Sequence, residues 1–163
     1  MSARDFLLFI LTGHRRIPPE NYAEISRRLE KTLIQLINQG CEYYYAGGAL
    51  GFDTIAAQTI LNLKETYPSI KLILVLPCEN QSKNWAKEDK EKYDDIKVKA
   101  DQIVYTSKVY FRGCMHKRNR YLVDNSDICI CYMINETGGT AYTVDYALKK
   151  GLNICNIAKM IEK

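Results

Sequence analysis

The sequence predicts an α/β domain: a doubly wound, mostly parallel β-sheet with helices on both faces. Short continuous apolar runs, typical of strands that are buried on both sides, alternate along the chain with segments whose apolar residues recur at helical spacing. No linker, repeat or low-complexity stretch interrupts this alternation, and 163 residues are enough to bury one core. We therefore expect residues 1–163 to form a single domain of the Rossmann-like class.

The first part of the chain predicts a strand, a helix and a second strand. Residues 6–11 form a continuous apolar run and predict a buried strand. The proline pair at 18–19 excludes an early helix, so the helical spacing of apolar residues places the helix over 21–38. Gly40 follows, where a left-handed residue commonly ends a helix. Residues 43–46 predict a short second strand.

The middle of the chain continues the pattern. A helix is expected over 53–65, with Asp53 as its N-cap. The apolar run at 71–76 predicts a third buried strand. The highly charged segment 85–100 predicts an exposed helix, and residues 103–105 predict a short strand after it.

The last third of the chain adds two helices and two strands. We expect a helix over 115–124, a strand over 128–133 and a helix over 140–150, which Gly151 would end. A final strand is expected over 153–157.

Composition indicates a globular protein with an anionic small ligand. Hydrophobic residues make up 47% of the chain and charged residues 26%, with a formal net charge of +4. This mild charge lacks the concentrated basic stripe typical of nucleic-acid binding, so nucleic acid is a secondary expectation. The apolar run at 6–11 is too short for a signal sequence or a membrane span, so we expect a cytoplasmic protein without membrane association.

The cysteines and histidines do not predict a metal site. The six cysteines include no C-x-x-C pair, and there are only two histidines. Cys129 and Cys131 alternate within an apolar strand and are expected to behave as small buried hydrophobes. Buried free thiols are typical of a reducing compartment. We expect neither a metal nor a cofactor.

Two glycine-rich loops carry the strongest functional signal. The loop GGALGFD at 47–53 and the loop GGT at 138–140 each follow a predicted strand and open a predicted helix. Glycine lets backbone N–H groups approach a ligand closely, and a helix N-terminus favours an anion. Because the carboxyl ends of parallel strands meet at one sheet edge, we expect both loops at a single phosphate site. The alternative is that each loop is only a tight strand-to-helix turn.

The expected ligand contacts come from the loops at this sheet edge. Glycine amides would cradle phosphate, arginines would neutralise it, and polar side chains would bind ribose or base. His14 is expected to hydrogen bond or stack rather than act as a general base, because no carboxylate near it in the sequence would orient it. The residues expected to bind the ligand are Gly13, His14, Arg15, Gly47, Gly48, Gly51, Asp53, Glu79, Arg118, Asn119, Gly138, Gly139, Thr140 and Thr143.

Five motifs, taken in order, resemble the SLOG superfamily. They are TGHR, GGALGFD, LPCENQSKNW, GCMHKRNRYLVDNSD and GGTAYTVDYALKKG, and they span nearly the whole chain. The chain looks most similar to the YpsA-related bacterial members, which are small Rossmann-like domains. The superfamily also joins the Smf/DprA DNA-processing proteins to the LOG phosphoribohydrolases. The resemblance implies a pocket for nucleotides or nucleotide-derived molecules.

The resemblance to the LOG enzymes is partial. Those enzymes cleave the N-glycosidic bond of nucleoside monophosphates and carry a Met-His-Glu-Arg-Lys segment and a Pro-Gly-Gly-x-Gly-Thr-x-x-Glu segment. Here MHKRN places Arg118 on the family's arginine, whereas Thr143 stands where the catalytic glutamate is expected. Threonine cannot stabilise an oxocarbenium-like transition state as a carboxylate does. The catalytic residues are therefore unknown, with Glu79 and Arg118 as the candidates.

Three functions follow from these observations. The first, which we favour because no catalytic constellation is visible, is a binding or sensor domain for a nucleotide-like small molecule. The second is N-glycoside hydrolysis of a nucleotide. The third is DprA-like binding of single-stranded DNA, with Tyr110, Phe111 and Trp85 as stacking side chains. Because related domains often self-associate through helices, we also expect a homodimer.

Overall fold

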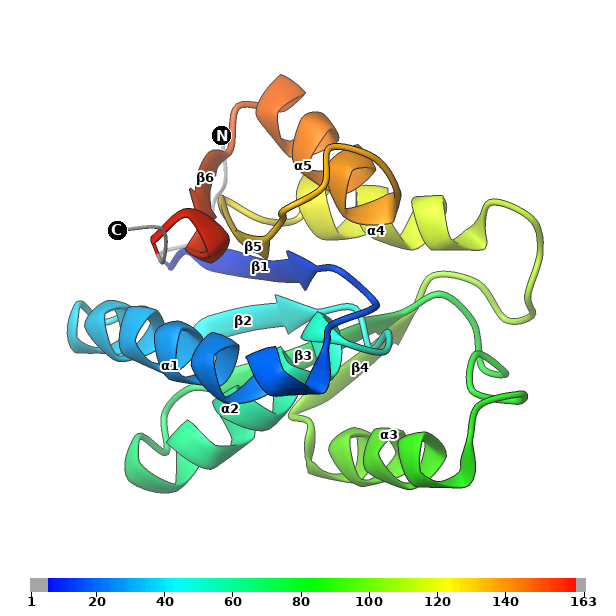
Figure 1. Ribbon diagram of the computed structural model, residues 1–163, viewed down its shortest axis with the longest axis horizontal. Helices are drawn as coiled ribbons and strands as arrows, with labels where there is room; N and C mark the ends of the chain where they lie inside the picture. Colours follow the sequence, from blue (N-terminus) through cyan, green and yellow to red (C-terminus); the bar gives the residue numbers. More distant parts are fainter. Residues whose placement is uncertain (1–5, 161–163) are drawn as a thin grey trace.

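The protein folds around one six-stranded sheet in which every strand pair is parallel (Figure 1). The computed structural model describes residues 6–160. The strand order is β4-β3-β2-β1-β5-β6. The strands are β1 (Leu8–Gly13), β2 (Tyr43–Ala46), β3 (Lys71–Leu76), β4 (Gln102–Tyr105), β5 (Ile128–Tyr132) and β6 (Asn153–Asn156). The predicted α/β class is confirmed.

Helices cover both faces of the sheet. In Figure 1, α1, α2 and α3 lie on one side of the strands, and α4 and α5 lie on the other. The helices are α1 (Tyr22–Asn38), α2 (Phe52–Thr66), α3 (Lys87–Lys99), α4 (Cys114–Asp124) and α5 (Gly139–Lys149), with short 3-10 turns η1 (Pro19–Asn21) and η2 (Ile157–Met160). None of the helices within residues 6–160 is long and apolar enough to cross a lipid bilayer.

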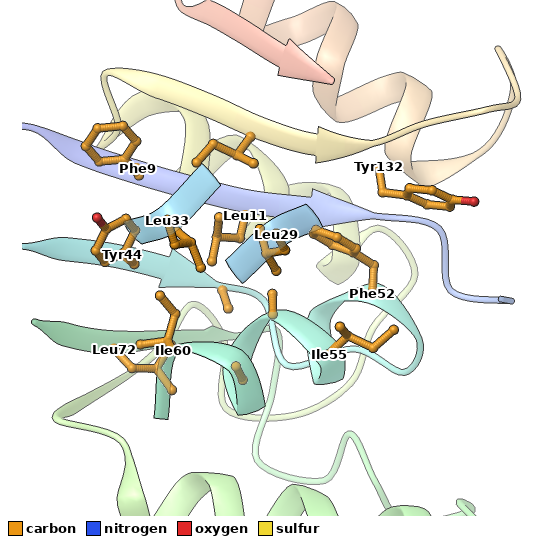
Figure 2. Packing of buried hydrophobic residues seen from close by; sticks show 14 of the residues in the cluster. Phe9, Leu11, Leu29, Leu33, Tyr44, Phe52, Ile55, Ile60, Leu72 and Tyr132 are labelled. Carbon is orange, nitrogen blue, oxygen red and sulfur yellow. The ribbon is translucent and has the colours of Figure 1, made fainter. Parts of the chain in front are cut away.

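The hydrophobic core is divided by the sheet into two clusters. Successive side chains of a strand point to opposite faces, so Phe9 and Leu11 pack beneath α1 and α2, whereas Ile10 packs on the side of α4 and α5. Figure 2 shows the larger cluster, where Leu29 of α1 and Phe52 of α2 converge on the central strands. Both faces of the central strands are buried, which explains why they appear as unbroken apolar runs.

The topology places a crevice between β1 and β5. From β1 the chain moves outward through β2, β3 and β4, and then returns to pair β5 with the other side of β1. The crossover helices therefore change faces at the boundary between these two strands. Open parallel sheets bind ligands outside the carboxyl ends of the strands at such a reversal point.

The start of α2 differs from the prediction. Asp53 was expected to cap this helix, but the helix begins at Phe52, and Gly51 occupies the N-cap position with φ 77°. Asp53 is already inside the first turn, where its carboxylate accepts a hydrogen bond from the backbone N–H of Ala49 at 3.1 Å. Its side chain therefore turns back beneath the loop.

Candidate functional site

A cavity of about 280 Å³ lies at the carboxyl ends of β1 and β5, at the point where the topology reverses. It is formed by the loops after β1, β2 and β5 together with the first turns of α4 and α5. Most of the residues expected to bind a ligand line it, namely Gly13, His14, Arg15, Asp53, Arg118, Asn119, Gly138, Gly139 and Thr140. Thr12, Ala49, Met115 and Thr137 also line it. These four were not singled out from the sequence, although Thr12 and Thr137 directly adjoin predicted site glycines.

The second glycine loop is open toward this cavity. Gly138 has φ 96°, and a Cβ atom added at Gly138 or Gly139 would meet no atom within 4 Å. Helix α5 begins at Gly139, and no side chain caps it. The first N–H groups of a helix have no partner within the helix and carry a partial positive charge. The loop thus presents unsatisfied amides, unobstructed by side chains, to the cavity.

Thr143 does not face the cavity, although it was expected to bind ribose or base. The side chain is completely buried, and its hydroxyl donates a hydrogen bond to the carbonyl of Gly139, one turn earlier in α5, at 2.9 Å. This internal bond is typical of a threonine within a helix. Thr143 therefore belongs to the buried side of α5.

The first glycine loop is closed by the protein itself. A Cβ atom added at Gly51 would come within 3.0 Å of the backbone carbonyl of Arg15, and one at Gly48 would come within 3.0 Å of the Leu76 side chain. Both glycines have positive φ angles, of 77° and 72°. Neither lines the cavity, and neither does Gly47. These glycines are required by the packing of the loop against the rest of the chain.

Arg118 and Asp53 are neighbouring buried charged side chains beneath the first glycine loop. A Cβ atom added at Gly47 would lie 2.9 Å from both Arg118 Nη1 and Asp53 Oδ2, so only glycine lets these groups approach the loop. Arg118 Nη1 donates to the carbonyl of Gly47 and, at 3.4 Å, to the carbonyl of Val75. Arg118 Nε donates to Asn119 Oδ1 at 2.8 Å. The guanidinium is thus engaged with the protein and holds the loop against α4.

Burial has the largest effect on the pKa values of Asp53 and Arg118. Burial raises the pKa of Asp53 to about 6, although the nearby Arg118 and the N–H of Ala49 both act in the opposite direction. Burial also lowers the pKa of Arg118, which the Asp53 carboxylate partly offsets. Among the described residues that line the cavity, Asp53 supplies the only carboxylate.

His14 fastens the second loop to the first strand. Its Nε2 accepts hydrogen bonds from the backbone N–H groups of Ile134 at 2.7 Å and Asn135 at 3.2 Å. An imidazole nitrogen can accept only when it is unprotonated, and burial lowers the pKa of His14 in the same direction. His14 was expected to hydrogen bond or stack with a ligand, whereas in the structure its Nε2 is bonded to backbone groups of the β5–α5 loop.

Arg15 provides a cation at the cavity whose head group is not engaged elsewhere. It is exposed, it lines the cavity, and within residues 6–160 its guanidinium has neither an ion pair nor a hydrogen bond. Asn119 accepts from Arg118 through its oxygen, so its NH2 group remains available to a ligand. Together these side chains could bind an anionic group and a neighbouring polar group.

Glu79 lies apart from the cavity. Its side chain is exposed in the loop after β3, and its backbone N–H donates to the carbonyl of Lys108 at 3.0 Å. Within the described part of the chain, histidine, cysteine, aspartate and glutamate side chains nowhere gather in threes around a point that could hold a metal ion.

Comparison with known families identifies close sequence relatives. The family model named YpsA, which is described as the YspA SLOG family, matches residues 18–161. The UPF0398 protein OB1025 of Oceanobacillus iheyensis is 32% identical over 148 residues, which cover 85% of this chain and 80% of the relative. The UPF0398 protein YpsA of Bacillus subtilis is 29% identical over 129 residues, covering 77% of this chain and 72% of the relative.

Solved structures with the same fold include two DNA processing proteins. DNA processing protein A (DprA) of Streptococcus pneumoniae superimposes with a TM-score of 0.65 at 16% identity, over 91% of this chain and 49% of that protein. DNA processing protein A of Helicobacter pylori, described for its single-stranded DNA binding mode, superimposes with a TM-score of 0.63 at 19% identity. That match covers 91% of this chain and 63% of the Helicobacter protein. At these identities the likeness is one of fold.

Proposed function

The chain belongs to the YpsA family of SLOG proteins, and from this premise we propose that it binds a nucleotide or nucleotide-derived molecule between β1 and β5. The observation that carries the proposal is the open glycine loop at the start of α5. Its unsatisfied amides face a cavity, and nothing lies within 4 Å of the position where side chains at Gly138 or Gly139 would begin.

A phosphate group is the ligand chemistry that fits this loop. Backbone N–H groups of Gly139 and Thr140 would donate to its oxygens, and the α5 dipole would favour its negative charge. Arg15, which also lines the cavity, would neutralise it. The free NH2 group of Asn119 and the hydroxyl of Thr12 would then be available to ribose or base.

Binding is favoured over N-glycoside hydrolysis because Asp53, the one carboxylate among the described residues that line the cavity, is buried and already bonded to the protein. Asp53 turns beneath the first glycine loop toward Ala49 and Arg118, and Glu79 lies outside the cavity. Incubation of the protein with AMP should release no adenine, as followed by chromatography. Release that disappears in an Asp53→Asn variant would replace the binding role with hydrolysis.

Isothermal titration with AMP, using two isosteric variants, tests the binding proposal. Gly139→Asp would place a carboxylate in front of the α5 amides, where it would occupy and repel an anion site, so the affinity for AMP should fall at least tenfold. Gly139→Asn adds a side chain of the same size without the charge and should retain most of the affinity. Equal effects of the two substitutions, or no AMP binding by the native protein, would contradict the proposal.

Single-stranded DNA is a second candidate ligand, supported by a separate surface. In the loop before α4, Tyr110 is 61% exposed and Phe111 is 44% exposed, and Lys117 Nζ lies 5.9 Å from the Phe111 ring. Exposed aromatic rings beside cations are typical of surfaces that stack single-stranded bases. Trp85 does not belong to this surface, because it is half-buried edge-on against Tyr93.

Fluorescence anisotropy with a labelled oligothymidine tests the DNA candidate. Binding through this surface should weaken as salt rises from 50 to 200 mM. It should also fall in a Tyr110→Ala, Phe111→Ala double variant and remain unchanged in Gly139→Asp. Binding lost in Gly139→Asp but not in the double variant would assign the DNA phosphate to the cavity instead.

A further inference from the structure

A second cavity, of about 600 Å³, lies on the other side of the first glycine loop. It is enclosed by the β1–α1 loop, the start of α1, and the facing sides of α2 and α3. The glycine loop separates the two cavities: Ala49 and Asp53 line the first, whereas Leu50 and Gly51 line the second. Arg15 lines both cavities.

The first cavity is too small to enclose a ligand larger than a sugar phosphate, so a larger ligand needs the second cavity as well. Pockets that enclose a whole small-molecule ligand usually measure about 300–1,000 Å³. At about 280 Å³ the first cavity is at the lower limit of this range, enough for a phosphate and the sugar attached to it. A larger ligand anchored at α5 must extend beyond it, and the adjoining cavity of about 600 Å³ offers room for a second group.

The walls of the second cavity suit a nucleoside. Ile17 and Ile55 are buried and contribute apolar surface for the face of a base. Thr54 and Gln58 contribute a hydroxyl and an amide that can hydrogen bond the edge of a base or a ribose.

Charged groups around the second cavity favour a ligand that carries negative charge. Its lining includes Arg15, Arg16 and Lys92, and within residues 6–160 none of the three has an ion pair. Asp89 is the one acidic side chain among the described lining residues, and it also has no ion pair. The lining as a whole is therefore net positive.

Arg15 lines both cavities, so its side chain lies where they adjoin. The backbone beneath is closed, because the N–H of Phe52 donates to the carbonyl of His14 at 3.0 Å and Gly51 packs against the carbonyl of Arg15. The residue itself is exposed and lines both cavities. A linking group that crosses from one cavity to the other must pass the guanidinium, which binds phosphate oxygens in pairs.

We propose that the ligand is a dinucleotide, in which two nucleosides are joined by a diphosphate. One phosphate and its ribose occupy the first cavity at α5 with the first base at the mouth of the cavity, the diphosphate passes Arg15, and the second nucleoside lies in the second cavity against Ile17 and Ile55. This inference rests on the proposed function, because the first nucleotide is the one assigned there to the α5 amides.

Titration calorimetry with AMP, ADP and diadenosine diphosphate tests this inference. Diadenosine diphosphate should bind at least tenfold more tightly than ADP, which carries the same number of phosphates but lacks the second nucleoside. Gln58→Ala, an exposed change on α2, should remove most of this advantage and leave AMP affinity within about twofold. Gln35→Ala, an exposed glutamine on α1 outside both cavities, serves as the matched control and should change neither.

The possible failures are distinguishable. If AMP and ADP bind but diadenosine diphosphate binds no more tightly, or if Gln58→Ala leaves its advantage intact, the dinucleotide inference is overturned and the proposed function stands. If none of the three ligands binds, both are overturned.

Discussion

The two glycine loops occupy equivalent places in the fold but present opposite surfaces. Each follows a strand that pairs with β1, and each opens a helix at the carboxyl edge of the sheet. Around the first loop, side chains added at Gly48 or Gly51 would collide with the protein. Around the second, side chains added at Gly138 or Gly139 would enter open space. The glycines of the first loop serve packing, and those of the second leave the loop accessible to a ligand.

This difference shows that glycine has two separate uses in a strand-to-helix loop. In the first loop it lets the chain pass close to Arg118, Leu76 and the backbone of Arg15. In the second it leaves the helix amides uncovered. Substitutions should therefore affect mainly stability in the first loop and mainly binding in the second.

The largest expected effect comes from removing Arg118, which holds the first loop closed. Arg118→Met would leave the buried Asp53 without its countercharge and two backbone carbonyls without their donor, so the free energy of unfolding at pH 7.5 should fall by about 3–5 kcal/mol. Urea unfolding measures this. Arg120→Met on the exposed side of the same helix is the control and should change it by less than about 0.5 kcal/mol. Similar losses in both variants would contradict the role of Arg118.

Alanine substitution of one glycine in each loop compares how tightly the two loops are packed. Gly51→Ala combines a strained positive φ with a collision against the backbone of Arg15 and should destabilise the fold by about 3 kcal/mol. Gly138→Ala also has a strained positive φ but open surroundings, so it should cost less, about 1–2 kcal/mol. Thermal and urea unfolding of both proteins should preserve this order, and the reverse order would contradict the packing argument.

The raised pKa of the buried Asp53 carboxyl should make the free energy of unfolding depend on pH. Because the pKa of Asp53 is about 6 in the folded protein and 3.8 is its ordinary value, the folded state binds more protons between these limits. Stability is therefore lost as pH rises through this window, on the order of 1–2 kcal/mol from this group. Asp53→Asn should remove that loss, so its stability relative to the native protein should improve between pH 4.5 and 7.5. The exposed Asp94→Asn on α3 should show no such trend.

The smallest expected effect on stability comes from the second loop. Gly139→Asp places a negative charge at the first position of α5, where the helix dipole favours it, so the fold should gain about 0.3–1 kcal/mol. Gly139→Asn should gain less. A variant that is more stable yet binds AMP more weakly would separate the ligand role of this loop from any role in folding. A clear loss of stability would instead show that the loop is packed.

The fold and the convergence of three loops at one sheet edge could be predicted from local sequence patterns. Continuous apolar runs identified the buried strands, and the alternation with helices predicted that the loops after β1, β2 and β5 would meet. Boundaries were less accurate, as the start of α2 before Asp53 illustrates. The expected homodimer stays a prediction, for which sedimentation of the purified protein is the test.

The difference between the glycine loops could not be predicted in the same way. Whether a glycine faces the protein or a ligand depends on partners that are distant in sequence, as with Arg118 and the carbonyl of Gly47, which are 71 residues apart. By contrast, the inward orientation of Thr143 had a local signal, because a threonine within a helix often bonds to the carbonyl one turn earlier.

The most direct test of the central claim is a two-dimensional ¹⁵N–¹H NMR titration of the native protein with AMP. We expect the amide signals of Gly139 and Thr140 to shift on saturation, while those of Gly48 and Gly51 in the closed loop change little. Large shifts at Gly48 and Gly51, with Gly139 and Thr140 unchanged, would contradict the assignment of the ligand to the second loop.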